Sequence, residues 1–445
     1  MHNKVKDFTK GNIPKKLIVF SLPFMFTNAA QIIYPVIDMA VVGKAFGGDA
    51  LYSVSAAGQL FSLFSVFGAG FCAGGQIYIA SLSGSGKKDE LQNAALHILI
   101  CSFSFSVVIS AICIFADKAM LHFVGVNAQN LYAAEKYFSV ISLSFVSIYL
   151  YNAVFSFFRG IGRSLSPFVI TVVSLMLKIF ADYVLVSKAG MQINGAAFST
   201  LLSNIVTCFI TLVYFLKINP DFLHNIRSFR LNKEHLRSIV KLGFPLALRN
   251  AAVNISMISA TKIVSSLDLG VKAAFGISIR AEELLNKVSQ GVTYAASSVI
   301  SQNNSAGLPT RVKKAVHTVW AECLAVYIPV AMLLILFPAQ FFKLFLNDAS
   351  VSAYADKFVL AMLISFPSMI IIRGTNGFIQ GTGKSGICFF IALLDGIIFR
   401  IGLCYLFGKI CNMGYWGYFL GYTASTYAGA IPGYIYYKYK TKEVR

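Results

Sequence analysis

The chain is dominated by long apolar segments, each of which is long enough to cross a lipid bilayer as a helix. A transmembrane helix needs about 20 predominantly apolar residues, whereas a membrane barrel shows ~10-residue segments of alternating polarity. The continuous runs therefore predict an all-α polytopic membrane protein with twelve transmembrane helices. We expect these spans at 14–42, 51–80, 91–115, 132–157, 165–187, 194–216, 237–266, 273–300, 312–337, 354–378, 385–408 and 412–437.

Composition supports this assignment and excludes other classes of protein. Only 13% of the 445 residues are charged and 57% are hydrophobic, whereas about 25% of the residues in a soluble domain are charged. This excludes a soluble enzyme, a nucleic-acid-binding protein and a secreted disulfide scaffold. The eight cysteines lie almost entirely in apolar segments without CxxC spacing, so we expect neither disulfides nor a metal site.

The basic residues predict which side each loop faces. The net charge is +20, and most of the 38 Lys and Arg residues fall in loops that share one side of the membrane with the N-terminus. Cytoplasmic loops carry such an excess. We therefore expect a multi-pass protein of the cell membrane (inner or plasma) with both termini in the cytoplasm.

The two halves of the chain repeat each other. Similar segments recur at an offset of about 220 residues, which indicates an internal duplication. This predicts two pseudo-symmetric six-helix bundles facing a central cleft: an N-lobe at 1–218, a cytoplasmic linker at 219–236 and a C-lobe at 237–445. The matching segments are 159–164 with 380–385, 21–24 with 243–246, and 81–88 with 301–307.

Several motifs, in this order and spacing, resemble the multidrug and toxic compound extrusion (MATE) family along the whole chain. They are Pro23 with Asp38-x-x-Val41-Val42-Gly43, Arg159-Gly160-x-Gly162, Asp182-Tyr183-Val184-Leu185 with Gly195-Ala196-Ala197, and Ala274-Phe275-Gly276-Ile277 leading to Arg280. The resemblance implies a secondary active exporter, not an enzyme, that moves small organic solutes or drugs out of the cell by alternating access. Its partners would be a small-molecule substrate and the bilayer, with no nucleic acid, and we expect a monomer.

The resemblance also implies an ion site in the first half, with one substitution. Matched to the family's pattern, the ion-coupling residues are Asp38, Asp182 and Thr200, but Lys178 stands where the family has asparagine. An ammonium there supplies the charge that sodium would bring, so we expect protons to be the coupling ion and no other cofactor. Lysine and aspartate side chains both shift their pKa readily when they are buried. The alternative is a permanent buried salt bridge.

Further polar side chains inside the spans are candidate substrate ligands. Gln31 and Tyr34 share a helical face with Asp38. In the second half, basic residues outnumber acids, which favours anionic or zwitterionic cargo. The alternative is structural, with Arg280 and Arg400 paired to Glu283 and Asp395. The second-half candidates are Arg249, Asn250, Asn254, Arg280, Arg373 and Arg400.

Two other functions fit the sequence less well. A flippase for a lipid-linked anionic precursor would also use a basic cavity, but twelve spans with these turn motifs favour the exporter. A membrane-embedded transferase would need clustered acid and base groups at one interface, which the sequence does not offer, so we expect no catalytic residues. The segment Gly381-Thr382-Gly383-Lys384-Ser385 resembles the end of a nucleotide-binding loop but lacks its first glycine, so ATP is not expected to drive the protein.

Overall fold

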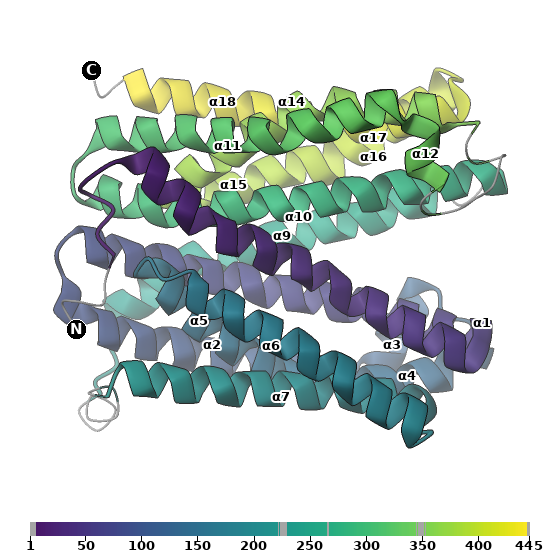
Figure 1. Ribbon diagram of the computed structural model, residues 1–445, viewed down its shortest axis with the longest axis horizontal. Helices are drawn as coiled ribbons and strands as arrows, with labels where there is room; N and C mark the ends of the chain where they lie inside the picture. The colour runs from purple at the N-terminus through teal and green to yellow at the C-terminus, as the bar shows by residue number, and fades with distance from the viewer. Residues whose placement is uncertain are drawn as a thin grey trace. The chain divides into compact units, whose positions relative to one another are not determined.

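A computed structural model of the chain describes most of the sequence and places helices in every expected span (Figure 1). The described residues are 6–220, 222, 229–264, 267–343, 345, 351 and 353–442. The side chains of residues 31–53, 129, 187, 192, 261, 262 and 269 lie outside this description.

The helices of the first half follow one another along the chain and are joined by short turns. α1 covers the first two expected spans, and α6 continues into a π-helical segment, η3, so that the two together form the fifth span. The elements are α1 (Ile13–Gly84), η2 (Lys88–Glu90), α2 (Leu91–Phe115), α3 (Asp117–Val124), α4 (Ala128–Ser142), α5 (Ser144–Gly160), α6 (Leu165–Asp182), η3 (Tyr183–Lys188) and α7 (Gln192–Ile218).

The second half follows the same plan. Its eleventh span is built from four successive helical pieces, α15 to η5, and its last span from α17 and α18. The elements are α9 (Lys233–Val264), α10 (Leu269–Ser305), α11 (Pro309–Leu336), α12 (Pro338–Lys343), α14 (Ala355–Gly381), α15 (Ser385–Ala392), η4 (Leu393–Phe399), α16 (Arg400–Tyr405), η5 (Leu406–Ile410), α17 (Gly414–Ala424) and α18 (Thr426–Lys442).

Eight helices in the described part of the chain are long and apolar enough to cross a membrane by length and composition alone. They match eight of the expected spans, from Val54–Gly84 to Ser385–Ile410. The others, at 14–42, 237–266, 273–300 and 412–437, are also helical. α9 and α10 carry several charged side chains inside their spans, which lowers the hydropathy of these two helices. Charged side chains inside membrane helices commonly mark functional sites.

Contacts divide the chain into two compact units that exchange their leading segments. The first unit contains Met1–Asp7 and Phe26–Ala247, and the second contains Phe8–Met25 and Leu248–Arg445. The beginning of α1 thus packs with the second half, and the beginning of α9 packs with the first. The predicted lobes at 1–218 and 237–445, with their linker at 219–236, remain a prediction about the membrane-embedded halves.

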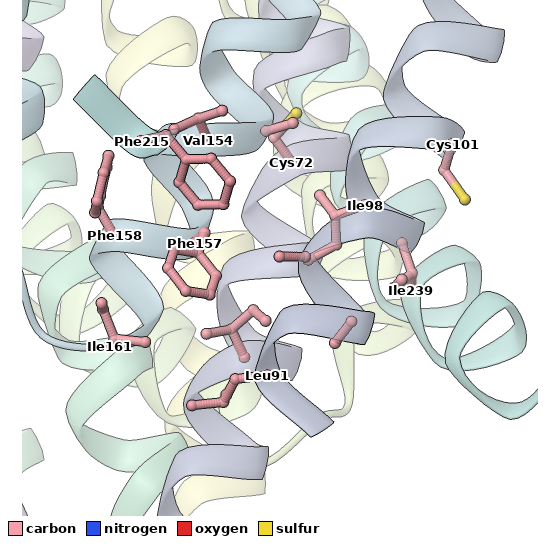
Figure 2. Packing of buried hydrophobic residues seen from close by; sticks show 14 of the residues in the cluster. Cys72, Leu91, Ile98, Cys101, Val154, Phe157, Phe158, Ile161, Phe215 and Ile239 are labelled. Atoms are coloured by element: carbon pink, nitrogen blue, oxygen red, sulfur yellow. The ribbon is translucent and has the colours of Figure 1, made fainter. Parts of the chain in front are cut away.

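A close-packed apolar core shows how α9 joins the first unit (Figure 2). Ile239 of α9 is fully buried and lies in one cluster with Ile98 of α2, Phe157 of α5 and Phe215 of α7. Inside a membrane, close packing of this kind, rather than removal of apolar surface from water, holds helices together. In the second unit, α14 holds the central place, because it packs against α10, α11, α17 and α18.

The internal repeat extends to hydrogen bonds in matching turns. After α5, Arg163 N–H donates to Phe158 O at 2.7 Å, and after α14, Lys384 N–H donates to Ile379 O at 3.0 Å. Gly162 and Gly383 have φ of 84° and 77°, the left-handed conformation that closes a helix in this way. The loop that resembles a nucleotide-binding motif is therefore a helix-ending turn.

Two glycines in matching positions bring helices of different halves into backbone contact. A methyl group on Gly70 of α1 would lie 2.5 Å from the Leu246 carbonyl oxygen of α9. A methyl group on Gly291 of α10 would lie 2.6 Å from the Met25 nitrogen of α1. Glycine is required at both positions because neither neighbour is a flexible side chain.

Candidate ion and substrate sites

A buried cluster of three side chains links α6 to α7 in the first unit. Lys178 Nζ lies 2.7 and 2.8 Å from the two carboxylate oxygens of Asp182, one turn further along α6. It also donates to Ser199 Oγ of α7 at 2.9 Å, and Ser199 Oγ donates in turn to Asp182 Oδ1. The exposed fractions of Lys178, Asp182 and Ser199 are 0%, 1% and 0%. Both charges are therefore paired and removed from water.

The other predicted ion-coupling residues differ in their placement. Thr200 is buried in α7, but its hydroxyl donates to the Ala196 carbonyl oxygen at 3.0 Å in its own helix. Its hydroxyl is therefore used within α7 and not on Lys178 or Asp182. Asp38, Gln31 and Tyr34 lie outside the described side chains, so their predicted roles stay predictions.

The second unit contains a related cluster at the end of η4 and the start of α16. Arg400 Nη2 lies 3.3 Å from Asp395 Oδ1, and Arg400 Nε donates to Ser425 Oγ at 3.2 Å. The Arg400 guanidinium also lies over the Tyr422 ring, 4.8 Å from its centroid. Arg400 stands 222 residues after Lys178. In each half, a buried cation on the fifth helix is thus held by an acid on its own helix and a serine on the next one.

Arg373 of α14 is a candidate substrate ligand with a buried N–H that has no acceptor among the described residues. Its side chain is 7% exposed, and Nη2 donates to Asn286 Oδ1 of α10. Its Nε is buried and has no hydrogen-bond partner in the described part of the chain. A guanidinium N–H without an acceptor is costly to bury, so this group is suited to receive an oxyanion.

The remaining candidates of the second half are less uniform. Arg249 is 8% exposed, and its Nη1 donates to Asn250 Oδ1 at 3.3 Å. Arg249 and Arg373 interact electrostatically, and neither is in a salt bridge among the described residues. Asn250 and Asn254 are half-buried in α9.

Arg280 occupies a different environment from the other arginines. Its side chain is 68% exposed and forms a salt bridge with Glu283, with Nη1 2.8 Å from Oε2. The two ion pairs offered as the structural alternative, Arg280 with Glu283 and Arg400 with Asp395, are thus present. Of the six predicted ligands in this half, Arg249 and Arg373 are the buried cations outside these pairs.

Sequence reasoning did not select several residues that complete these clusters. Ser199 and Ser425 each contact the buried ion pair of their unit, and Asn286 binds Arg373. Serine is too common in these spans to single out. Asn286, however, lies on α10 between Glu283 and Lys287, and a polar run of that kind inside a membrane helix was the available signal.

The geometry limits the chemistry of these sites. No group of three or more His, Cys, Asp or Glu residues that could hold a metal ion occurs in the part of the chain that the structure describes. What the two units offer is a saturated ammonium–carboxylate pair on α6 and a guanidinium with a spare N–H on α14. The first suits proton exchange, and the second suits an anionic group.

Comparisons with known proteins place the chain in one group. The MatE family model matches residues 23–184 and 245–406, which lie in the two repeated halves. The multidrug export protein MepA of Staphylococcus saprophyticus is 22% identical over 395 residues, covering 88% of this chain and 86% of that protein.

Solved structures share the fold at low sequence identity. A MATE protein crystallised in a straight conformation superposes with a TM-score of 0.90, at 21% identity and 98% coverage of both chains. A transporter of the MOP superfamily from Pyrococcus furiosus, described as having a binding pocket of reversed polarity that suggests a different function, gives a TM-score of 0.88. It is also 21% identical, with 98% of this chain and 97% of that one covered.

Proposed function

Because this chain belongs to the MatE family, whose members are transporters and not enzymes, we propose that it is a secondary active exporter of small organic molecules. It is a multi-pass membrane protein with twelve transmembrane helices in two lobes. Its relatives include a protein named as a multidrug export protein and one named as a probable multidrug resistance protein. In this proposal, the two lobes expose the cargo site alternately to the two sides of the membrane.

The coupling ion in this proposal is the proton, and the observation that carries it is the contact between Lys178 and Asp182. The ammonium lies within 2.8 Å of both carboxylate oxygens. A sodium ion attracted to Asp182 would have to displace this charge, or share the carboxylate with it. A proton needs no such space, because its arrival on Asp182 releases Lys178 and lets α6 and α7 repack.

The cargo in this proposal carries a negative group. Arg249 and Arg373 are buried cations outside the salt bridges, and Arg373 keeps one N–H without an acceptor. A carboxylate, phosphate or sulfonate would satisfy that N–H and offset the positive charge. The transporter from Pyrococcus furiosus, whose reversed pocket polarity is described as suggesting a different function, is a precedent for variation in pocket charge within this fold.

Two further parts of the proposal concern the setting. We infer a monomer in the cell membrane, and the distribution of Lys and Arg supports a cytoplasmic position for both termini. The flippase alternative is not favoured, because relatives of this chain are named as a multidrug export protein and a probable multidrug resistance protein.

The test is transport in proteoliposomes that contain the purified full-length protein. A pH gradient or a sodium gradient is imposed separately, and movement of a fluorescent organic anion, fluorescein, is compared with that of an organic cation, ethidium. The proposal expects transport driven by the pH gradient and a preference for the anion. Transport driven by sodium alone would contradict the proton assignment, and transport of ethidium alone would contradict the cargo assignment.

A further inference from the structure

Glu282 of α10 is a fully buried acid that the proposed mechanism does not use. Its side chain is 1% exposed. Oε2 has no hydrogen-bond partner in the part of the chain that the structure describes. The other oxygen, Oε1, lies 3.2 Å from Ser365 Oγ of α14. An ionised carboxylate in this place would leave most of its acceptor sites empty in a low-dielectric interior.

The Ser365 hydroxyl has a closer hydrogen-bond acceptor than Glu282. Ser365 Oγ lies 2.7 Å from the Met362 carbonyl oxygen, which is 0.5 Å closer than Glu282 Oε1. A hydroxyl has one proton to donate and two lone pairs to accept with. When Ser365 donates to Met362, its lone pairs can accept a bond only from a Glu282 that carries a proton. The hydrogen-bond pattern is therefore complete with the acid form.

The charges around Glu282 lead to the same form. Arg400 lies near enough to interact with it electrostatically, but the Arg400 guanidinium is committed to Asp395, Ser425 and the Tyr422 ring. Arg400 and Asp395 balance each other, and Arg249 also interacts with Asp395. Because the Arg400 guanidinium is held in this way, an ionised Glu282 would be a buried charge without an ion-pair partner of its own.

The other titratable groups near this position do not change that balance. On α10 itself, Glu283 is paired with Arg280, and Lys287 interacts with both Glu283 and Arg373 of α14. Tyr422 of α17 and Tyr327 of α11 also interact electrostatically with Glu282. Both tyrosines are neutral in their ordinary state.

We propose that Glu282 is a proton-binding site of the second unit, with Ser365 as its hydrogen-bond partner, and that its proton is exchanged during the transport cycle. This inference rests on the proposed function for its role in transport, but not for the protonation itself. The cycle would then use two proton sites, one on α6 and one on α10. Loss of the proton would create a negative charge next to Arg400 and draw the guanidinium away from Asp395.

Infrared spectroscopy of the purified full-length protein tests the protonation directly, without any transport. A protonated carboxylic acid gives a carbonyl-stretch band that an ionised one lacks. The difference between wild type and Glu282→Gln at neutral pH should contain this band, whereas the difference between wild type and Glu283→Gln should not. Glu283 is the matched control because it is the next residue on the same helix and is held in a salt bridge. Absence of the band from the Glu282→Gln difference would overturn the proposal.

A second variant and a transport measurement keep the outcomes distinct. Ser365→Ala retains both acids and should move the pH at which the band is lost, because the partner of the acid proton is removed; an unchanged pH would overturn the role of Ser365. In proteoliposomes, Glu282→Gln should lose transport of fluorescein driven by a pH gradient, and Glu283→Gln should keep it. Undiminished pH-driven transport by Glu282→Gln would overturn the exchange step. If wild type itself transports neither dye under any gradient while the infrared band is found, the proposed function fails and the proton site stands.

Discussion

Gly70 lies against the Leu246 carbonyl oxygen so closely that no side chain fits between α1 and α9. The matching glycine 221 residues later, Gly291, lies in the same way against Met25 of α1. Each contact joins the second helix of one half to the first helix of the other, just after Pro23 or Pro245. The duplication has thus preserved a pair of helix crossings as well as a pattern of turns.

Alanine at Gly70 should destabilise the protein, because its methyl group would clash with backbone that cannot rotate away. Overpacking of this kind costs about 1–3 kcal/mol. We expect Gly70→Ala to lower the midpoint of thermal unfolding of the purified protein in detergent, and Gly291→Ala to do the same.

The matched controls are Gly58→Ala in α1 and Gly276→Ala in α10, where an added methyl group meets nothing within 4 Å. Alanine is the better helix former by about 1 kcal/mol, so both controls should keep or raise the unfolding midpoint. Equal losses in all four variants would mean that the crossings tolerate a methyl group.

Replacing Lys178 by asparagine should change the ion response of the protein. The variant removes the ammonium that saturates Asp182 and supplies an amide oxygen in its place. We expect Lys178→Asn to gain transport driven by a sodium gradient in proteoliposomes, which wild type should lack. Removing one partner of a buried pair can cost about 3–5 kcal/mol, so folding must first be checked by size-exclusion chromatography.

Lys188→Asn is the control for this experiment, because Lys188 is an exposed residue near the end of the same span. It should leave the ion response unchanged. Strong sodium-driven transport by the wild-type protein would contradict our account of the cluster on α6 and α7.

Arg373→Gln should weaken export of an acidic substrate more than that of a cationic one. The substitution removes the buried positive charge and the N–H that has no acceptor. One charge-assisted hydrogen bond is worth roughly 1.5–3 kcal/mol, which corresponds to a more than tenfold rise in the KM for fluorescein. Arg280→Gln, at an exposed salt bridge, should have a smaller effect. Equal losses for both dyes in Arg373→Gln would show that the arginine is structural.

Two histidines hold the beginning of α9 against the first unit. His97 Nδ1–H donates to Asn93 O at 2.8 Å, while its Nε2 accepts the Asn232 N–H at 2.9 Å. His235, which precedes the expected span, lies 2.6 Å from the Tyr78 hydroxyl and 5.1 Å from the His97 ring centre to centre. Burial lowers the pKa of His235 below its ordinary value of 6.5, and His97 lowers it further.

A lowered histidine pKa means that the folded form binds protons less readily than the unfolded form. This packing should therefore lose stability as the pH falls below about 6.5, and not above it. Glu90 and Glu234 oppose the shift and Lys87 adds to it, but burial is the largest cause. We expect hydrogen exchange of the Asn232 amide to accelerate in acid relative to His235→Gln measured at the same pH. Parallel pH profiles in the two proteins would contradict this.

The predicted orientation can be checked at two exposed positions. A cysteine at Glu234, before the span 237–266, should not react with a membrane-impermeant thiol reagent in intact cells. A cysteine at Lys188, on the opposite side, should react. The exposed Cys411 needs to be replaced first, because it lies in a loop predicted to face outward. Labelling at position 234 in intact cells would reverse the topology.

Much of the fold could be predicted from the sequence, because membrane helices follow from apolar length and the repeat follows from motif spacing. The spacing of Lys178 and Asp182 placed them one turn apart on a helix, and the structure has them in contact. The third member of that cluster could not be predicted. Whether Ser199 or Thr200 faces Asp182 depends on the rotation of α7 against α6, which no local pattern determines.

The half against which each leading segment packs could not be predicted from the sequence either. Residues 229–247 and 8–25 are similar in character, and local composition does not tell which half each one packs against. The same limit applies to Glu282 and Glu283, which are neighbours in one helix. One is 1% exposed without a partner for Oε2, and the other is in a salt bridge; only the packing of α14 against α10 distinguishes them.

The exchange has a consequence for the order in which the protein is made. The segment Phe8–Met25 leaves the ribosome well before the residues with which it packs, which follow Leu248. The first unit in turn is complete only after the beginning of α9 has been synthesised. Domains of many proteins fold one after the other during synthesis, but here neither unit is complete until translation has passed the middle of the chain. A nascent chain that stalls at residue 218 would lack α9, the helix that packs against Gly70.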